Sequence, residues 1–91
     1  MLSFLDFIKN PPTIKILIEE LIRACDVYVA RKITDDELRY LIQGWANTDG
    51  NKLFSDTDSF NPTVVQRVGK KRLNLINRML VGFQPRLRKL Q

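Results

Sequence analysis

The chain has 91 residues, of which 44% are hydrophobic and 27% are charged. This length fits one domain, since a typical domain has roughly 100–150 residues, and the composition is that of a globular protein. A multi-domain enzyme is therefore excluded. Cys25 is the one cysteine, which excludes an intramolecular disulfide, and the lack of histidine removes the usual zinc and general-base chemistry.

The two parts of the chain differ in charge. Residues 1–60 contain 7 Lys or Arg and 10 Asp or Glu, a net charge of −3, whereas residues 61–91 contain 8 Lys or Arg and no acid, a net charge of +8. Such an asymmetry predicts contact with a polyanion or with an acidic protein surface. The alternative is a solvated face without a partner, although eight uncompensated charges repel one another and lower stability.

The N-terminal arm, residues 1–11, is apolar but does not resemble a secretory signal. It lacks a basic start and a small-residue cleavage site, and Asp6 interrupts its apolar run. No segment approaches the roughly 20 apolar residues that span a bilayer. We therefore expect a cytoplasmic protein without membrane contact, with Cys25 reduced and buried. Phe4 and Phe7 are candidates for a homodimer contact, because exposed aromatic side chains favour association.

The helical core is expected over residues 12–83. Asn10 or Thr13 can cap a first helix, whose apolar positions 14, 17, 18, 21, 25 and 28 have helical spacing and which should end near Lys32. Thr34 and Glu37 then form a capping box, with Ile33 and Leu38 placed for a hydrophobic staple. The second helix has a buried stripe of Leu38, Leu41, Ile42 and Trp45 and ends within residues 47–50. Trp45 belongs to the core, or its edge anchors an interface.

Residues 51–60 are predicted to form a loop that returns Leu53 and Phe54 to the core. Residues 47–58 also have some of the oxygen spacing of a calcium-binding EF-hand loop. However, Lys52 stands where that loop requires glycine. An ordinary turn is therefore favoured, and we expect neither a metal nor a cofactor.

A further helix should begin at Asn61-Pro62, with Val64, Val65 and Val68 buried. Gly69 either breaks this helix or lies within a longer one. A second apolar face follows, and Gly82 and Pro85 end it before a basic tail at 84–91; this face comprises Leu73, Leu75, Ile76, Met79, Leu80 and Phe83. The sequence thus predicts an all-α fold, a compact bundle of about four helices with an apolar N-terminal arm and a basic C-terminal helix and tail.

Five polar side chains share an arc of about 120° on the last helix: Lys70, Lys71, Asn74, Asn77 and Arg78. Lysine and arginine neutralise phosphates or bind guanine, and asparagine pairs with adenine. Together with Arg67 and the tail residues Arg86, Arg88 and Lys89, they are the candidate binding residues. Arg72 falls in the apolar arc, so it either extends to solvent or pairs with an acid from the N-terminal half.

Two DNA-binding motifs fit this region in part. Residues 61–78 could form a helix-turn-helix with Gly69 in the turn, but Lys70 and Arg78 stand at positions that are usually apolar. Residues 68–71 resemble the second half of a helix-hairpin-helix turn, although Arg67 replaces its first glycine. Neither motif is specific.

An enzyme would need an activated nucleophile, a carboxylate pair in a cleft or a metal. Cys25 has no histidine to activate it, and Asp35, Asp36 and Glu37 are explained by their favourable position at a helix N-terminus. We therefore expect a protein without catalytic activity.

Several segments resemble a small family of short helical proteins from Gram-positive bacteria and their phages. They are Leu-Ile-Arg-Ala-Cys-Asp-Val-Tyr at 21–28, Ile-Thr-Asp-Asp-Glu-Leu at 33–38, Lys-Leu-Phe at 52–54 and Gly-Lys-Lys-Arg-Leu at 69–73. The resemblance covers about residues 12–80. It implies a small accessory protein, such as one from a mobile element, and assigns no activity or site residues.

These observations predict a small regulatory protein that binds nucleic acid, specifically DNA, through its basic C-terminal helix. The alternative is a regulator or inhibitor that docks the same basic face on an acidic protein surface. Both use the same residues, so composition cannot separate them.

Overall fold

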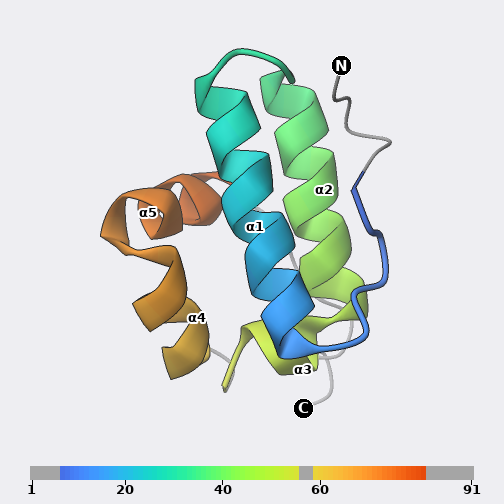
Figure 1. Ribbon diagram of the computed structural model, residues 1–91, viewed down its shortest axis with the longest axis vertical. Helices are drawn as coiled ribbons and strands as arrows, with labels where there is room; N and C mark the ends of the chain where they lie inside the picture. Colours follow the sequence, from blue (N-terminus) through green and yellow to red (C-terminus); the bar gives the residue numbers. More distant parts are fainter. Residues whose placement is uncertain (1–6, 56–58, 82–91) are drawn as a thin grey trace.

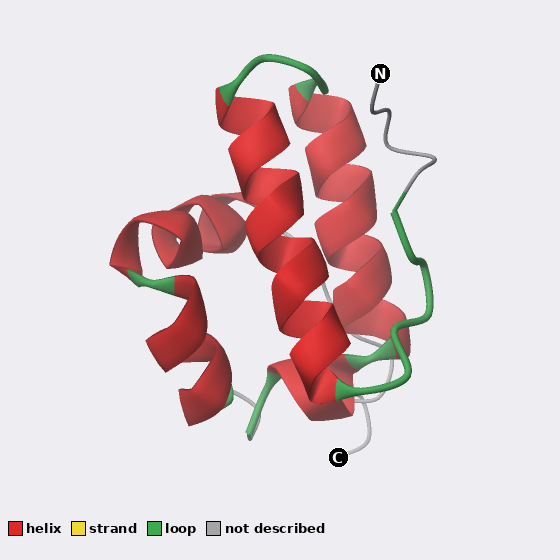
Figure 2. Cartoon of the chain, viewed as in Figure 1, coloured by secondary structure: helices red, strands yellow, loops and turns green. Residues whose placement is uncertain are grey.

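The computed structural model describes residues 7–55 and 59–81, which contain five helices and no strand. The expected all-α fold is confirmed, with one more helix than predicted. Figures 1 and 2 show α1 and α2 side by side as an antiparallel hairpin, with α4 and α5 along one side of α1. The core lies between these layers and includes Leu17, Leu21, Ile42, Trp45, Val64, Val68 and Ile76.

Helix α1 spans Ile14–Val29 and begins at Thr13, whose hydroxyl accepts a hydrogen bond from the Ile16 amide at 3.2 Å. Of the two predicted caps, the structure uses Thr13. The helix ends three residues before Lys32 because Arg31 adopts a φ of 64°. The Arg31 and Lys32 amides then bond back to the carbonyls of residues 28 and 27, both at 2.9 Å, which closes the helix in a Schellman motif.

Helix α2 spans Asp35–Thr48 and has the capping box predicted at its start. The Glu37 amide donates to the Thr34 hydroxyl at 3.1 Å, and the Thr34 amide donates to the Glu37 carboxylate at 2.9 Å. The predicted stripe is buried, and Trp45 is only 1% exposed, so Trp45 belongs to the core.

The prediction that residues 51–60 are a loop is wrong in part, because Gly50–Leu53 form the short helix α3. Leu53 is buried as expected, and the Phe54 ring stacks on Phe60 at 5.2 Å. Asp49 lies 3.2 Å from the Lys52 ammonium, which partly neutralises the carboxylate that an EF-hand would offer to calcium. A helix at residues 50–53 also replaces the open loop that such a site needs.

Helix α4 spans Pro62–Val68, and the Asn61 side chain caps it by accepting from the Thr63 amide at 2.9 Å. Val64 and Val68, four residues apart, face the core. The prediction that Val65 is buried is wrong: it is 41% exposed, because it lies about 100° around the helix from Val64.

The N-terminal segment that begins at Phe7 is held against α1 and α2. The Phe7 ring is 4% exposed, packs edge-on against Trp45 at 6.3 Å and lies 4.4 Å from the Arg23 guanidinium. The Ile8 amide donates to Glu20 at 3.0 Å, and the Trp45 indole donates to the Ile8 carbonyl at 2.9 Å. The expectation that Phe7 is exposed is therefore wrong, because its own chain buries it, whereas a homodimer contact through the N-terminal arm stays a prediction. Phe4 lies outside the described residues.

We predict that Phe7→Ala destabilises the fold by about 3 kcal/mol, because it leaves a cavity between Trp45 and Arg23. Urea unfolding measures the effect. Ile8→Ala is the control, since Ile8 is 44% exposed and its backbone makes the bonds, and it should cost less than about 0.5 kcal/mol. Equal effects of the two substitutions would contradict the described packing.

Candidate nucleic-acid interface

Gly69 separates α4 from α5, the helix that spans Lys70–Met79. Its φ is 90°, a conformation that residues with a side chain rarely adopt, and a Cβ at this position would meet no atom within 4 Å. The Gly69 amide still donates to the α4 carbonyl of residue 65 at 3.2 Å, and its carbonyl accepts from the residue 73 amide in α5 at 2.9 Å. The chain therefore turns between the two helices at one residue.

The polar arc predicted for this helix is the exposed face of α5. Lys70, Lys71, Asn74, Asn77 and Arg78 are all exposed, whereas Ile76 and Met79 are buried. Arg67, near the end of α4, is also exposed. The tail residues Arg86, Arg88 and Lys89 lie outside the described residues, as do Phe83, Gly82 and Pro85.

Arg72 does not belong to this face, because it pairs with Asp26 of α1. The Arg72 Nε lies 2.9 Å from Asp26 Oδ1, and its Nη2 lies 3.2 Å from Oδ2, which is a two-point contact. The Nη1 also donates to the Val68 carbonyl at 3.2 Å, and the bond to Asp26 raises the pKa of Arg72. Of the two alternatives for Arg72, pairing with an acid from the N-terminal half is confirmed.

The opposite end of α5 is bonded to α2. Arg39 Nη1 and Gln43 Nε2 both donate to the Met79 carbonyl, at 3.2 and 2.9 Å. A cation near a helix C-terminus also interacts favourably with the helix dipole. The first turn of α5 is thus fixed to α1 and its last residue to α2.

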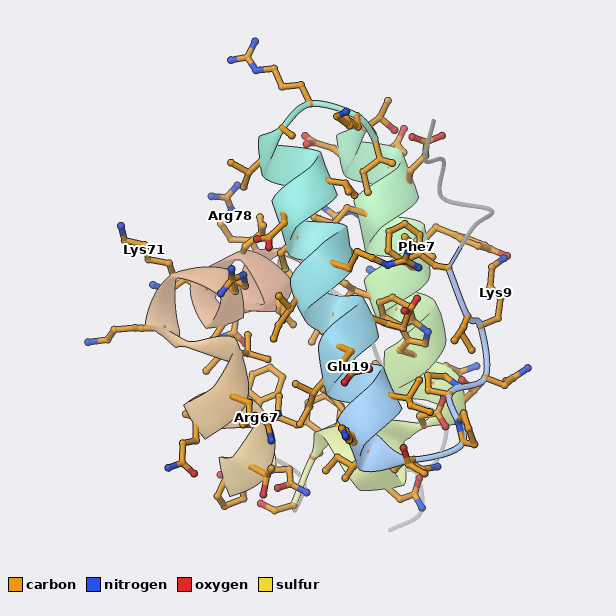
Figure 3. The ribbon with its side chains drawn as sticks, viewed as in Figure 1. Phe7, Lys9, Glu19, Arg67, Lys71 and Arg78 are labelled. Atoms are coloured by element: carbon orange, nitrogen blue, oxygen red, sulfur yellow. The ribbon has the colours of Figure 1, made fainter. Side chains whose placement is uncertain are left out.

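The other cations of α4 and α5 are not neutralised by nearby acids. Within residues 7–55 and 59–81, no carboxylate oxygen lies within 4.0 Å of the charged groups of Arg67, Lys70, Lys71 or Arg78. Figure 3 shows Lys71 and Arg78 on the side of the molecule opposite Lys9. Among the described acids of the first sixty residues, Asp26 therefore pairs with Arg72, and none neutralises the predicted face.

A polar contact near Arg78 was not predictable from sequence spacing. The Tyr28 hydroxyl donates to Asp35 across the α1–α2 turn. This bond raises the pKa of Tyr28, and the positive charge of Arg78 acts in the opposite direction. Arg78 therefore lies near the turn, so the charged face extends toward that end of the α1–α2 hairpin.

The sequence analysis did not identify Arg39 and Gln43 as residues that hold α5. Nothing in their spacing indicates that they bind a carbonyl 36–40 residues away.

The connection between α4 and α5 can be compared with the two DNA-binding motifs. In a helix-turn-helix the turn has about 3–4 residues, whereas here only Gly69 lies between α4 and α5. The helix-turn-helix interpretation therefore has no support from the connection. The likeness of residues 68–71 to a helix-hairpin-helix turn stays a prediction.

Cys25 is fully buried in α1, as expected. Burial raises its thiol pKa to about 12, and the charge of Asp26 acts in the same direction. Such a thiol supplies almost no thiolate at neutral pH. The part of the chain that the structure describes also contains no group of three or more Cys, Asp or Glu side chains that could hold a metal ion.

Residues 7–81 match a protein family described as "conserved hypothetical protein", and the chain belongs to that family. The match covers most of the chain, in agreement with the extent of the resemblance found in the sequence. No curated protein and no solved structure shows significant similarity to the chain. Among the described helices, none is both long enough and apolar enough to cross a membrane.

We predict that Cys25 in the folded protein reacts with a thiol reagent at pH 8 at least about 100-fold more slowly than in urea, because the thiol is buried and protonated. A disulfide-exchange reagent followed by absorbance measures both rates. Comparable rates in the two states would contradict the burial of Cys25.

We predict that Arg72 and Asp26 are coupled by about 0.5–1 kcal/mol, because the contact has two points but lies at the surface. A double-mutant cycle of Arg72→Ala, Asp26→Ala and the double variant measures the coupling by urea unfolding. The same cycle on Arg39 and Asp26 serves as a control, since no bond joins these residues. A coupling of zero for Arg72 and Asp26 would contradict the contact.

Proposed function

We propose that the protein is a small regulatory protein without catalytic activity that binds duplex DNA through the exposed face of α5. The observation that carries the proposal is the group of four exposed cations, Arg67, Lys70, Lys71 and Arg78, without a carboxylate within 4.0 Å among the described residues. DNA phosphates supply the missing negative charge, and their release of bound counterions favours association.

The attachment of α5 supports this proposal. A helix fixed at both ends holds the backbone that carries the cations in one orientation, so binding has to order only their side chains. Asn74 and Asn77 lie on the same face, where their amides suit an adenine edge. The tail residues Arg86, Arg88 and Lys89 would add contacts to phosphates.

The second candidate is an acidic protein surface that receives the same face. It rests on the same four cations, and no described contact favours it over DNA. We also propose, from the resemblance noted in the sequence, that the protein acts in the cytoplasm as an accessory protein of Gram-positive bacteria or their phages.

We predict that the protein binds an arbitrary DNA duplex and that its affinity falls at least roughly 100-fold between about 50 and about 200 mM salt. This is the loss expected for four phosphate contacts, and contacts from the tail would increase it. Fluorescence anisotropy of a labelled duplex measures the affinity. The combined substitution of Lys71, Asn74 and Arg78 by alanine should abolish binding at about 200 mM salt. At lower salt, the slope of log affinity against log salt should correspond to about two fewer phosphate contacts.

The matched control replaces Lys9 and Lys15 with alanine, which removes the same two charges from exposed positions outside the proposed face. It should retain most of the affinity. Circular dichroism must show that both variants fold. If neither salt condition gives binding while a protein partner is retained stoichiometrically, the acidic-protein alternative replaces the DNA proposal.

A further inference from the structure

The exposed face of α5 has an amide side chain at its centre. At about 100° per residue, Lys70 and Arg78 lie about 40° to either side of Asn74 around the helix. Lys71 and Asn77 lie further out, about 60° to either side. Lys70 and Arg78 are also about 6 Å before and after Asn74 along the helix axis, at 1.5 Å per residue. Asn74 is thus the middle of the exposed face in both directions, with a cation one turn away on each side.

The fold of the single chain does not use the Asn74 amide. Its side chain is exposed and makes no hydrogen bond within residues 7–55 and 59–81. Asparagine is also a poorer helix former than lysine, arginine or alanine, so it does not stabilise α5. A face that bound phosphates alone would gain more from a cation at its centre than from a neutral amide. The amide donor and acceptor of Asn74 are therefore available to a ligand.

An asparagine amide matches one base edge of DNA. In the major groove, adenine offers an amino donor beside the acceptor at ring position 7, and asparagine can bond to both at once. Guanine offers two acceptors there, so the amide oxygen of asparagine would have no donor to bind. An asparagine that enters the major groove therefore favours adenine over guanine.

The spacing of the cations on α5 fits the same groove. The major groove is about 12 Å wide and admits an α-helix. Lys70 and Arg78 are eight residues apart, which is about 12 Å along α5, and their side chains are longer than that of Asn74. If α5 enters the groove with Asn74 toward the bases, the longer side chains on either side reach the phosphates that border it.

We infer that Asn74 recognises an adenine in the major groove, so that the protein prefers A·T to G·C base pairs. This inference rests on the proposed DNA-binding function and adds the groove and the base that are recognised. The cations contact phosphates, which every sequence presents, and so give affinity without sequence preference. Asn74 supplies the preference.

A preference for A·T pairs can also arise in the minor groove. Some A·T sequences have a narrow minor groove whose negative potential attracts arginine and lysine. That mechanism involves neither the Asn74 amide nor ring position 7 of adenine, which faces the major groove. An adenine analogue altered at this position therefore separates the two mechanisms.

Fluorescence anisotropy at one salt concentration, with three labelled duplexes of equal length, tests the inference. One duplex has A·T pairs, one has G·C pairs, and the third has A·T pairs in which 7-deazaadenine replaces adenine. This analogue carries a C–H group at ring position 7, so it loses the acceptor but keeps its base pairing and its minor-groove edge. The protein should bind the A·T duplex about tenfold more tightly than the other two, as expected for one bidentate contact to a base.

Three single variants show which side chain is responsible. Asn74→Ala should bind all three duplexes equally, with an unchanged salt dependence, because it removes no charge. It should remain folded, since alanine favours the helix. Lys71→Ala should weaken binding to every duplex and keep the preference, because it removes a phosphate contact. Asn77→Ala should also keep the preference, because Asn77 lies at the border of the face.

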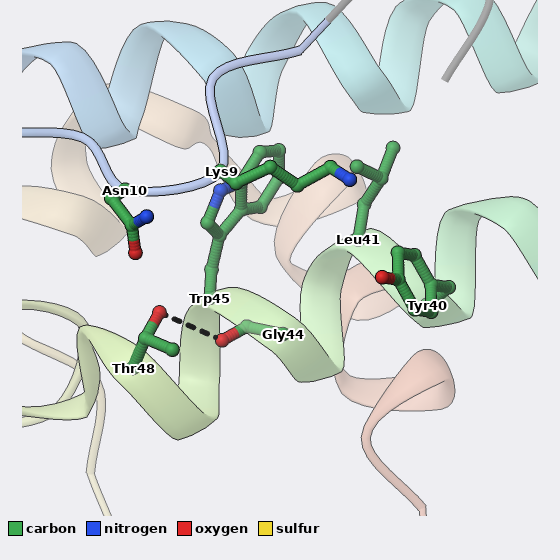
Figure 4. A pocket seen from close by; sticks show the side chains of 7 residues that line it. All are labelled: Lys9, Asn10, Tyr40, Leu41, Gly44, Trp45 and Thr48. Carbon is green, nitrogen blue, oxygen red and sulfur yellow. Dashed lines mark hydrogen bonds between the residues drawn. The ribbon is translucent and has the colours of Figure 1, made fainter. Parts of the chain in front are cut away.

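Asn10→Ala is the matched control. Asn10 is also an exposed amide without a hydrogen bond among the described residues. Figure 4 shows it next to Lys9, at a cavity of about 370 Å³ between α2 and the N-terminal segment. Lys9 lies on the side of the molecule opposite Lys71 and Arg78 (Figure 3). The control should bind the three duplexes as the unaltered protein does.

Four results would overturn the inference. Equal affinity of the unaltered protein for A·T and G·C duplexes would overturn it and leave the DNA-binding proposal intact. So would a preference that persists on the 7-deazaadenine duplex, or one that Asn74→Ala retains. Absence of binding to every duplex would overturn both the inference and the proposed function.

Discussion

The contact between Arg72 and Asp26 determines how the basic part of the chain is presented. Arg72 is the cation of α5 that points toward the rest of the fold, and Asp26 of α1 binds it at two points. This pairing orients the first turn of α5, so that Lys70 and Lys71, immediately before Arg72, point away from the core. One acid from the first sixty residues thus fixes α5, and no other carboxylate in the described part of the chain pairs with its remaining cations.

Long polar side chains on the α1–α2 hairpin hold the peripheral segments in the same manner at other points. Arg39 and Gln43 bind the last carbonyl of α5, and Glu20 and Trp45 bind the two backbone groups of Ile8. Each of these bonds satisfies a backbone group at the end of a helix or in an extended segment. The hairpin therefore positions both the proposed DNA-binding face and the N-terminal segment that begins at Phe7.

Local sequence signals predicted the helices well where the responsible interactions are local. The capping box at Thr34, the Asn61-Pro62 start and the polar arc of α5 depend on residues a few positions apart, and all three agree with the structure. The errors arise where a contact between distant parts of the chain determines whether a side chain is buried. Phe7 was expected to be exposed, because sequence spacing does not show that Arg23 of α1 and Trp45 of α2 come together around its ring. For the candidate site, the sequence indicated the exposed cations and the two alternatives for Arg72. It could not indicate that the partner of Arg72 is Asp26, which is 46 residues away.

The most direct test of the account is a titration of the isotopically labelled protein with a DNA duplex of about 20 base pairs, followed by nitrogen–proton correlation spectra. Such a duplex is roughly 68 Å long at about 3.4 Å a base pair, which exceeds the 42 Å length of the protein. The account predicts shifts for amides of α5, at Lys70, Lys71, Asn74 and Arg78, while the Nε–H signal of Arg72 stays in place because its bond to Asp26 persists. Shifts confined to other surfaces, or loss of the Arg72 signal as DNA displaces Asp26, would contradict it.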